Sequence, residues 1–359
     1  MIAYIIRRLL MMPLLLFGVS LLVFGMISLL SPQERLALYL RELPRNEEQA
    51  ETLIRKYGLD EPFLVQYANW LFGRPVTDPA TGETVTSGGV LRGDLGYSRT
   101  GSDAIVNIIK RRFPATLELT LWSILPIVGL GVAMGVAAAV RHNKMGDQAL
   151  RVFSIVGWSM PSFVFGLLVL MIFYARLQWF PPDNLSDWAS QVVNDAAMFT
   201  RYTGMNTLDT LLNGRPDIFF DALRHMVLPI LTLAYIQWAL LVRITRASML
   251  ESLRQDYVTT ARSKGLDERA VIHRHARPNA MVPVVTVGGF VIVGLLNGVV
   301  ITETIFNYPG IGSVAAAAAA QLDVLTVLGF TLFNGVILLV ANLVVDVLYA
   351  VVDPRVRLS

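Results

Sequence analysis

Long apolar stretches alternate with polar segments along the whole chain. Six of these stretches approach the ~20 residues that an α-helix needs to cross a bilayer. Met226–Val242 is the shortest, and Arg243 could extend it by reaching to the membrane surface. The pattern predicts an all-α membrane protein with about six transmembrane helices. The stretches are Leu9–Leu30, Leu119–Val140, Val152–Ala175, Met226–Val242, Met281–Ile301 and Val324–Val352, the last interrupted by Asp346.

The composition supports this prediction and removes several kinds of chemistry. Hydrophobic residues make up 54% of the 359 residues and charged residues only 16%, whereas soluble domains carry about 25% charged residues. The chain has no cysteine, which excludes disulfides, thiolate catalysis and cysteine-based zinc sites.

The first apolar stretch has two interpretations. Arg7 and Arg8 precede it as in a secretory signal peptide, but the stretch is long for the apolar core of such a peptide. The residues that follow, SPQERLAL, lack the small-residue pattern of a cleavage site. An uncleaved first span is therefore favoured.

Lys and Arg gather in alternate connections between the spans, and from Pro278 to Pro354 there are none. Because short basic loops stay on the cytoplasmic side, both termini are predicted to be cytoplasmic in a multi-pass inner-membrane protein. Lys110, Arg111 and Arg112 do not fit, but they lie in a long segment, and long segments follow the rule poorly. The basic connections contain Arg7 and Arg8; Arg141, Lys144 and Arg151; Arg243, Arg246, Arg254, Arg262, Lys264, Arg269, Arg274 and Arg277; and Arg355 and Arg357.

The pattern divides the chain into residues 1–30 with the first span, an external segment at 31–115, and a transmembrane core at 116–359 with a cytoplasmic loop at 249–280. In the external segment, Asn46–Tyr57 is predicted to be an amphipathic helix that stops at Gly58. A second helix begins near Pro62 and runs to about Leu71. The turn-rich sequence after it, RPVTDPATGETVTSGGVLRG, is predicted to form a hairpin.

No catalytic or metal site emerges from the sequence. The chain has no GxxxxGK[ST] phosphate loop and no GxSxG serine, and His273 and His275 are two apart, so they do not share one helix face. Gly129, Gly131 and Gly135 lie inside a span, where small residues let helices approach closely. Asp346 is the only candidate inside the spans for an ion or proton pathway, too little for a carrier driven by protons or sodium. It could also simply pair with an arginine at the inner surface.

The polar loop DYVTTARSKGLDERAVIHRHARP, residues 256–278, is the most informative segment. Tyr257–Lys264 is predicted to be a helix that stops at Gly265, and Asp267 to cap a second helix that ends at Arg277 before Pro278. A basic loop held against anionic lipid would explain the charges. It would not explain the smooth face of small residues, which suits insertion into a groove of another protein.

This loop resembles the "EAA" loop of ABC importer permeases, and the form DYVxTAxxKGL resembles the dipeptide/oligopeptide and nickel permease family. The resemblance extends over most of the chain. Similar motifs are YIIRRL (4–9), YGLDEPFLVQY (57–67), GDLGYS (93–98), RRFPATLEL (111–119), WFPP (179–182), LRHMVLPILTLA (223–234), ETIFNYPGIG (303–312) and NLVVDVLYAVVDPRVR (342–357).

The resemblance implies a type I ABC importer permease fold and a transport subunit without an ATPase site of its own. It implies a second permease, two ATPase subunits that bind ATP and Mg, an extracytoplasmic substrate-binding protein, and no nucleic acid. Short peptides are the implied substrate, with nickel chelates or another small solute as the alternative. Residues implied to contact the ATPase are Asp256, Tyr257, Thr260, Ala261, Lys264, Gly265 and Leu266.

Four polar residues in and beside the last two spans are candidates for the path or its gate: Glu303, Asp323, Asn342 and Asp346. The sequence departs from the family in a longer segment at 83–93 and in an alanine run at 315–320, which we expect to form a short outer helix. A stand-alone secondary carrier and a membrane anchor or sensor are the rival functions, and neither explains the 256–278 loop.

Overall fold

The computed structural model describes residues 2–39, 46–77, 84–296 and 299–352. In this part of the chain five helices are long and apolar enough to cross a membrane, and a bent helix pair makes a sixth candidate. The prediction of an all-α membrane protein with about six spans is confirmed.

The chain divides into two compact units, each described by itself. One comprises Pro114–Ser313 and Ala341–Ser359, and the other Ile2–Phe113 and Val314–Val340. Helices α5, α15 and α16 contribute to both units because the divisions fall inside them.

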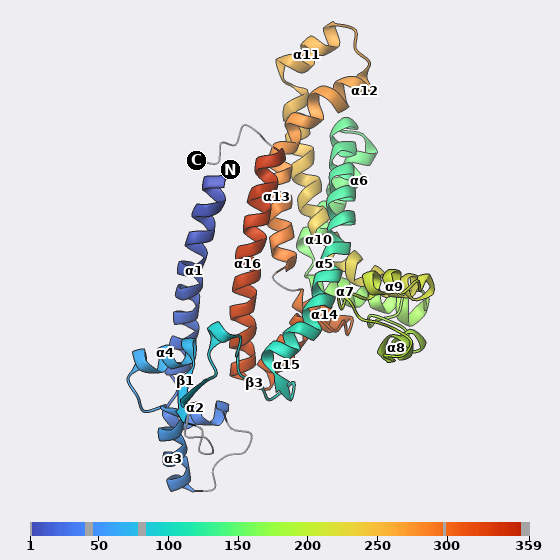
Figure 1. Cartoon of the computed structure of the whole chain (residues 1–359). Coiled ribbons are helices and arrows are strands. Elements are labelled where there is room, and N and C mark those ends of the chain that lie inside the picture. Colours follow the sequence, from blue (N-terminus) through green and yellow to red (C-terminus); the bar gives the residue numbers. More distant parts are fainter. Residues whose placement is uncertain (1, 40–45, 78–83, 297–298, 353–359) are drawn as a thin grey trace. The chain divides into compact units, whose positions relative to one another are not determined.

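The unit around residues 114–313 is built on α10, which packs against α13, α6, α7 and α9. Figure 1 shows α11 and α12 at one end of α10 and the lobe of α8 and α9 at the other. With 38 residues, α10 is about 57 Å long at 1.5 Å per residue. The helices of this unit are most of α5 (Ile105–Val140), α6 (Met145–Ser159), α7 (Ser162–Val169), the π-helix η2 (Leu170–Arg176), α8 (Asp187–Asn194), α9 (Asn206–Leu212), α10 (Pro216–Leu253), α11 (Asp256–Ser263), α12 (Glu268–Ala270), the π-helix η3 (Val271–Ala276), α13 (Arg277–Leu296), α14 (Val300–Ile305), the start of α15 (Ile311–Ala320) and the end of α16 (Val324–Val352).

Glycines allow α5 to pack closely on α10. A Cβ at Gly131 would lie 3.0 Å from the Leu241 side chain, and one at Gly135 would lie 2.5 Å from Cβ of Thr245. Such distances leave no room for a methyl group, which confirms the packing role predicted for these two glycines. A Cβ at Gly129 would meet nothing within 4 Å, so the prediction does not extend to that residue.

Two predicted helix boundaries are wrong. The third apolar stretch is not one straight helix, because α6 and α7 meet at an angle of 109° around Met160 and Pro161. The helix that starts after Asp267 does not end before Pro278 but continues through η3 into α13. Proline lacks an N–H and its ring crowds the preceding turn. The wider π-turns just before Pro278 relieve that crowding.

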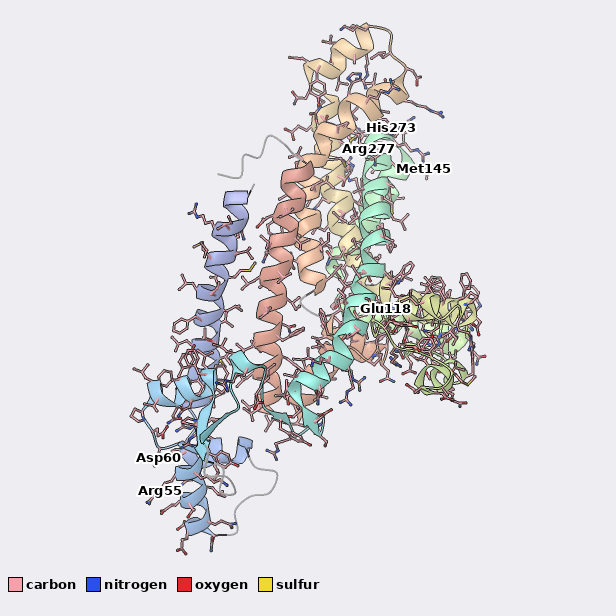
Figure 2. The ribbon with its side chains drawn as sticks, in the orientation of Figure 1. Arg55, Asp60, Glu118, Met145, His273 and Arg277 are labelled. Carbon is pink, nitrogen blue, oxygen red and sulfur yellow. The ribbon has the colours of Figure 1, made fainter. Side chains whose placement is uncertain are left out.

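The unit of residues 2–113 and 314–340 contains the first span and the predicted external segment. Asn46 caps α3 through Gln49 N–H, and Gly58 ends it at φ 60°. Figure 2 shows Arg55 in the last turn of α3 and Asp60 just beyond it. The hairpin prediction is confirmed by the antiparallel β1–β2 pair, while residues 78–83, between these strands in sequence, lie outside the described residues. The elements are α1 (Ile2–Ser28), α2 (Pro32–Tyr39), α3 (Glu47–Tyr57), α4 (Phe63–Phe72), β1 (Arg74–Thr77), β2 (Thr84–Ser87), the 3-10 helix η1 (Val90–Arg92), β3 (Tyr97–Ser98), β4 (Asp103–Ala104), the start of α5, most of α15 and most of α16 (Val324–Val352).

Candidate functional site

Helix α11 has one face buried in its own chain and one face open to the surroundings. Val258 is fully buried and Ala261 is 5% exposed; both pack in a cluster with Met249 of α10 and Val271 of η3. The small side chain of Ala261 therefore brings α11 close to the other helices of this chain. Six of the seven residues that the family resemblance implies for the ATPase contact are exposed: Asp256, Tyr257, Thr260, Lys264, Gly265 and Leu266.

Ser252 connects α11 to the helices on either side of it. Its hydroxyl donates to the Ala276 carbonyl at 2.8 Å and lies 2.7 Å from the Tyr257 hydroxyl. A serine hydroxyl has one hydrogen, so the Tyr257 hydroxyl donates to Ser252. One residue near the end of α10 thereby binds both α11 and the π-helix that leads into α13.

A closed turn follows α11 at Gly265, which has φ +75°. This left-handed conformation costs a residue with a Cβ energy, whereas glycine adopts it freely. Across the turn, Arg262 Nη2 lies 2.7 Å from Oε1 of Glu268. The hydrogen bond with Glu268 raises the pKa of Arg262 above its usual value. Because both side chains are about half exposed, this pair orients the turn more than it stabilises the fold.

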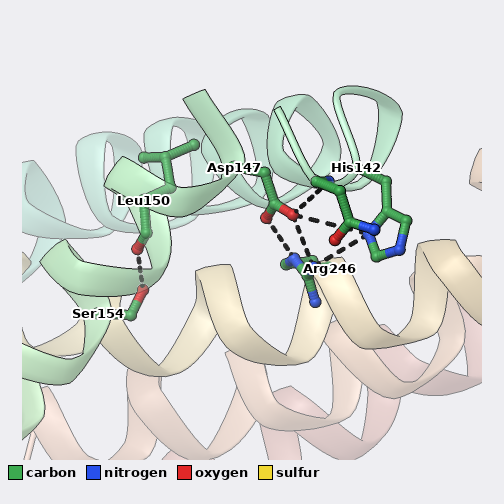
Figure 3. A network of polar contacts seen from close by, with 6 residues as sticks. His142, Asp147, Leu150, Ser154 and Arg246 are labelled. Atoms are coloured by element: carbon green, nitrogen blue, oxygen red, sulfur yellow. Dashed lines mark hydrogen bonds and ion pairs between the residues drawn. The ribbon is translucent and has the colours of Figure 1, made fainter. Parts of the chain in front are cut away.

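A buried carboxylate joins the α5–α6 connection to α10 near the same end of the unit. Asp147, at the start of α6, is fully buried and accepts two hydrogen bonds from Arg246 at 2.5 and 2.7 Å (Figure 3). Asn143 N–H donates to the same carboxylate at 3.0 Å, and Nδ1 of His142 lies 3.6 Å from it. A two-point guanidinium–carboxylate contact fixes direction as well as distance. The pair therefore holds α6 and α10 in one register.

A cavity of about 370 Å³ lies near the middle of α10, beside the bend between α6 and α7. Ser162, Thr232, Gln237 and Thr302 give it hydroxyl and amide groups, and the other lining residues are glycine or apolar. A few polar groups on an apolar wall are also the composition of many small-molecule sites. The other lining residues are Leu233, Ile236, Gly294, Leu295, Val299, Val300 and Ile301.

Glu303, a candidate for the path or gate, is buried just behind that cavity wall. Its carboxylate accepts hydrogen bonds from Thr116 Oγ1 at 2.7 Å and from Ser313 N–H at 2.9 Å. Burial raises the pKa of this carboxyl, and these hydrogen bonds oppose the rise. Glu303 holds the turn that precedes α15 and caps that helix. Its neighbour Thr302 faces the cavity instead.

Asp323, the second path candidate, is buried at the start of α16. It accepts hydrogen bonds from Ser98 Oγ at 3.0 Å, Thr100 N–H at 2.9 Å and Thr326 Oγ1 at 2.7 Å. Burial raises the pKa of Asp323, but the hydrogen bonds outweigh it and lower the pKa below its usual value. The carboxylate ties β3 to α16. The remaining two candidates, Asn342 and Asp346, are half-buried one turn apart on α16.

Sequence reasoning missed the four polar residues of the cavity. Gln237 offered a signal, because it is the one amide inside the apolar stretch Met226–Val242. Ser162 follows Pro161, a residue that disfavours a continuous helix. Periodicity alone could not bring Ser162, Gln237 and Thr302 together, since they come from three separate helices.

Comparison with known proteins decides the family. Residues 131–358 match the family described as "binding-protein-dependent transport system inner membrane component", and residues 1–120 match the N-terminal region of such membrane components. The chain belongs to this family of transport permeases. It therefore has the type I ABC permease fold and is a multi-pass transport subunit.

Relatives of this permease match it almost from end to end. The di/tripeptide transport system permease protein of Pseudomonas aeruginosa is 35% identical over 99% of both chains. The oligopeptide transport system permease protein AppB of Bacillus subtilis is 34% identical over 99% of this chain and 100% of its own. The probable D,D-dipeptide transport system permease protein of Escherichia coli is 37% identical over 85% of this chain and 84% of its own.

Proposed function

We propose that this permease imports short peptides as one of two transmembrane subunits of an ABC importer. The support is its end-to-end similarity to permeases named for dipeptides and oligopeptides. These names favour a peptide over the nickel-chelate alternative. A second permease, two ATPase subunits and an extracytoplasmic binding protein complete the proposed transporter, and ATP and Mg bind to the ATPase subunits.

The proposed coupling element is α11 with its glycine turn. Its exposed residues Asp256, Tyr257, Thr260, Lys264 and Leu266 would occupy a cleft of one ATPase subunit. The opposite face, with Val258 and Ala261, is fixed to α10 and η3, so α11 cannot move without them. This division into a bound face and a free face is the observation that carries the coupling proposal. Force on α11 would tilt α10 and α13 as rigid levers.

This coupling requires α11 to face the cytoplasm, as the distribution of Lys and Arg predicts. Both termini are then cytoplasmic, and the lobe of α8 and α9, at the other end of α10, faces outward. Asp147 and Arg246 would transmit the tilt of α10 to α6, because their two-point contact resists sliding of one helix along the other.

The proposed peptide path includes the cavity beside Gln237. A side-chain amide carries both donors and an acceptor, as does each peptide unit of a substrate. Gln237 can therefore bind a peptide backbone whatever its side chains are, while the apolar wall accepts varied side chains. Glu303 and Asp323 support the surrounding structure, since their oxygens are occupied within the chain.

Proteoliposomes that contain the assembled transporter test this function. With binding protein outside and ATP inside, they should accumulate a labelled dipeptide, and empty vesicles or vesicles with ADP should not. Uptake by the purified single chain with an ion gradient and no ATP would instead support a secondary carrier. Peptide binding without any uptake would support a sensor.

A further inference from the structure

The two faces of helix α9 are the reverse of those of a helix on the surface of a soluble domain. Its polar face is buried and its apolar face is exposed. Its polar residues Asn206, Thr207, Asp209 and Thr210 are 5% exposed or less. Its leucines point the other way: Leu208 is 43% exposed, Leu211 53% and Leu212 62%. A surface helix in water shows the opposite arrangement.

Thr207, Asp209 and Thr210 on the buried polar face of α9 form hydrogen bonds within their own chain. Thr207 Oγ1 donates to Glu118 of α5 at 2.6 Å and accepts from Trp122 Nε1 at 3.1 Å. Asp209 accepts from the N–H and hydroxyl of Thr203, both at 2.8 Å, and from Gly204 N–H at 2.9 Å. This network fixes the rotation of α9 about its axis, so the leucines cannot turn inward.

The contact with Glu118 sets the height of α9 along the membrane-crossing helices. Glu118 immediately precedes the apolar stretch that starts at Leu119, and Figure 2 shows it on α5 beside the α8–α9 lobe. α9 therefore lies level with the edge of that stretch. In a bilayer, the edge of an apolar stretch is expected near the boundary between lipid headgroups and acyl chains, where amphipathic helices lie in the plane of the membrane.

Exposed apolar side chains continue from α9 onto the spans beside it. Leu121 and Leu125 of α5 flank Trp122 and are 48% and 69% exposed, and Phe220 near the start of α10 is 67% exposed. Tyr202 and Trp188 of the same lobe are also exposed. Tyrosine and tryptophan are enriched at membrane–water interfaces because their rings are apolar and their polar groups remain hydrated.

We propose that the leucine face of α9 is a lipid-contact surface that lies in the membrane at the headgroup–acyl boundary. Acyl chains cover Leu208, Leu211 and Leu212, and the bonds to Glu118 and Trp122 hold the helix at that depth. The surface is continuous with the lipid-facing sides of α5 and α10. It anchors the α8–α9 lobe on one side of the membrane while α11 receives force on the other.

The natural chain has no cysteine, so single cysteines can report on this surface. Leu211→Cys would be labelled with bimane in the assembled transporter in nanodiscs, and its fluorescence measured with lipids brominated near the headgroup or near the chain end. Lipid contact predicts a loss of fluorescence that is larger for the shallow bromines. Leu14→Cys on α1, which is 65% exposed in a span, provides the lipid-facing reference. Glu48→Cys, exposed on α3, provides the water-facing one.

The alternatives give different results with the same sample. Quenching by aqueous iodide without quenching by brominated lipid would place α9 in water and overturn the proposal. Quenching by neither would show that a protein covers the face, the second permease or the binding protein, and would also overturn it. Retained peptide uptake by the labelled variant would show that the assembly is intact.

Discussion

The hydroxyl of Tyr257 lies 2.7 Å from the hydroxyl of Ser252, which in turn donates to the carbonyl of Ala276 at 2.8 Å. Helix α10, helix α11 and the π-helix η3 are thereby joined at one side chain. Tyr257 is 40% exposed, so it also belongs to the face that is open to a partner. In the coupling that we propose, a push on that face would reach both α10 and α13 through Ser252.

Replacement of Ser252 tests this connection. Ser252→Ala removes both hydrogen bonds, each contributing about 0.5–1.5 kcal/mol, and Tyr257→Phe removes only one. We expect more ATP hydrolysed per peptide transported in both variants, with the larger increase in Ser252→Ala. Ser263→Ala is the control, because that hydroxyl bonds only to the Thr259 carbonyl of its own helix. An unchanged ratio in Ser252→Ala would remove the connection from the coupling mechanism.

Gly265 provides a second test at the turn. Gly265→Val forces a β-branched residue to φ +75°, at a cost of about 1–3 kcal/mol. A Cβ there would meet nothing within 4 Å, so backbone strain and not crowding is the cause. We expect membrane insertion to persist while ATP-driven uptake falls. Gly265→Asn should retain most uptake, because asparagine tolerates this conformation. Normal uptake by the valine variant would count against a role of this turn in docking.

Loss of Asp147 should destabilise the unit built on α10. Asp147→Ala leaves Arg246 without its carboxylate partner, and breaking such a buried pair costs about 3 kcal/mol. Arg246→Lys keeps the charge but loses the two-point contact, so its effect should be smaller. The melting temperatures of both variants are measured on the detergent-solubilised transporter, with size-exclusion chromatography used to monitor thermal unfolding. Equal melting temperatures for Asp147→Ala and the unaltered protein would refute this structural role.

A substitution at Gln237 tests whether the cavity belongs to the proposed peptide path. Gln237→Leu removes hydrogen bonds to the peptide backbone, worth about 0.5–1.5 kcal/mol, so transport efficiency should fall roughly two- to tenfold. The loss should be similar for dipeptides with different side chains, since the proposed contact is with the peptide backbone. Thr331→Val on α16, whose hydroxyl bonds to Val327 of its own helix, is the matched control. A loss that depends on the peptide side chain would assign Gln237 to side-chain selection instead.

A substitution at Gly310 tests whether Glu303 has a structural role in the turn that precedes α15. A Cβ at Gly310 would overlap the carboxylate of Glu303, whereas one at Gly288 would meet nothing within 4 Å. Overpacking of this kind costs about 1–3 kcal/mol. Gly310→Ala should therefore lower the melting temperature of the transporter, and Gly288→Ala should leave it nearly unchanged. Similar melting temperatures for both variants would show that the turn around Glu303 can relax.

The sequence by itself determined the elements whose signals are local. Apolar length predicted the spans, and the cap at Asn46, the left-handed stop at Gly58 and the turn at Gly265 follow from residue types that favour those conformations. The family also followed from sequence, because its motifs recur in order along the chain. The bend at Pro161 and the helix through Pro278 were mispredicted, since neighbouring helices and π-turns decide what a proline does.

Only the tertiary structure decided which side chains meet. Ser162, Gln237 and Thr302 form one cavity, and Thr207 reaches Glu118 across 89 residues. The inverted face of α9 has the same origin. On a surface helix in water, the leucines would face the protein core. In α9, the buried hydrogen bonds of Thr207 to α5 hold the leucines on the exposed side. Such bonds join residues far apart in sequence, and periodicity describes only neighbours along a helix or strand.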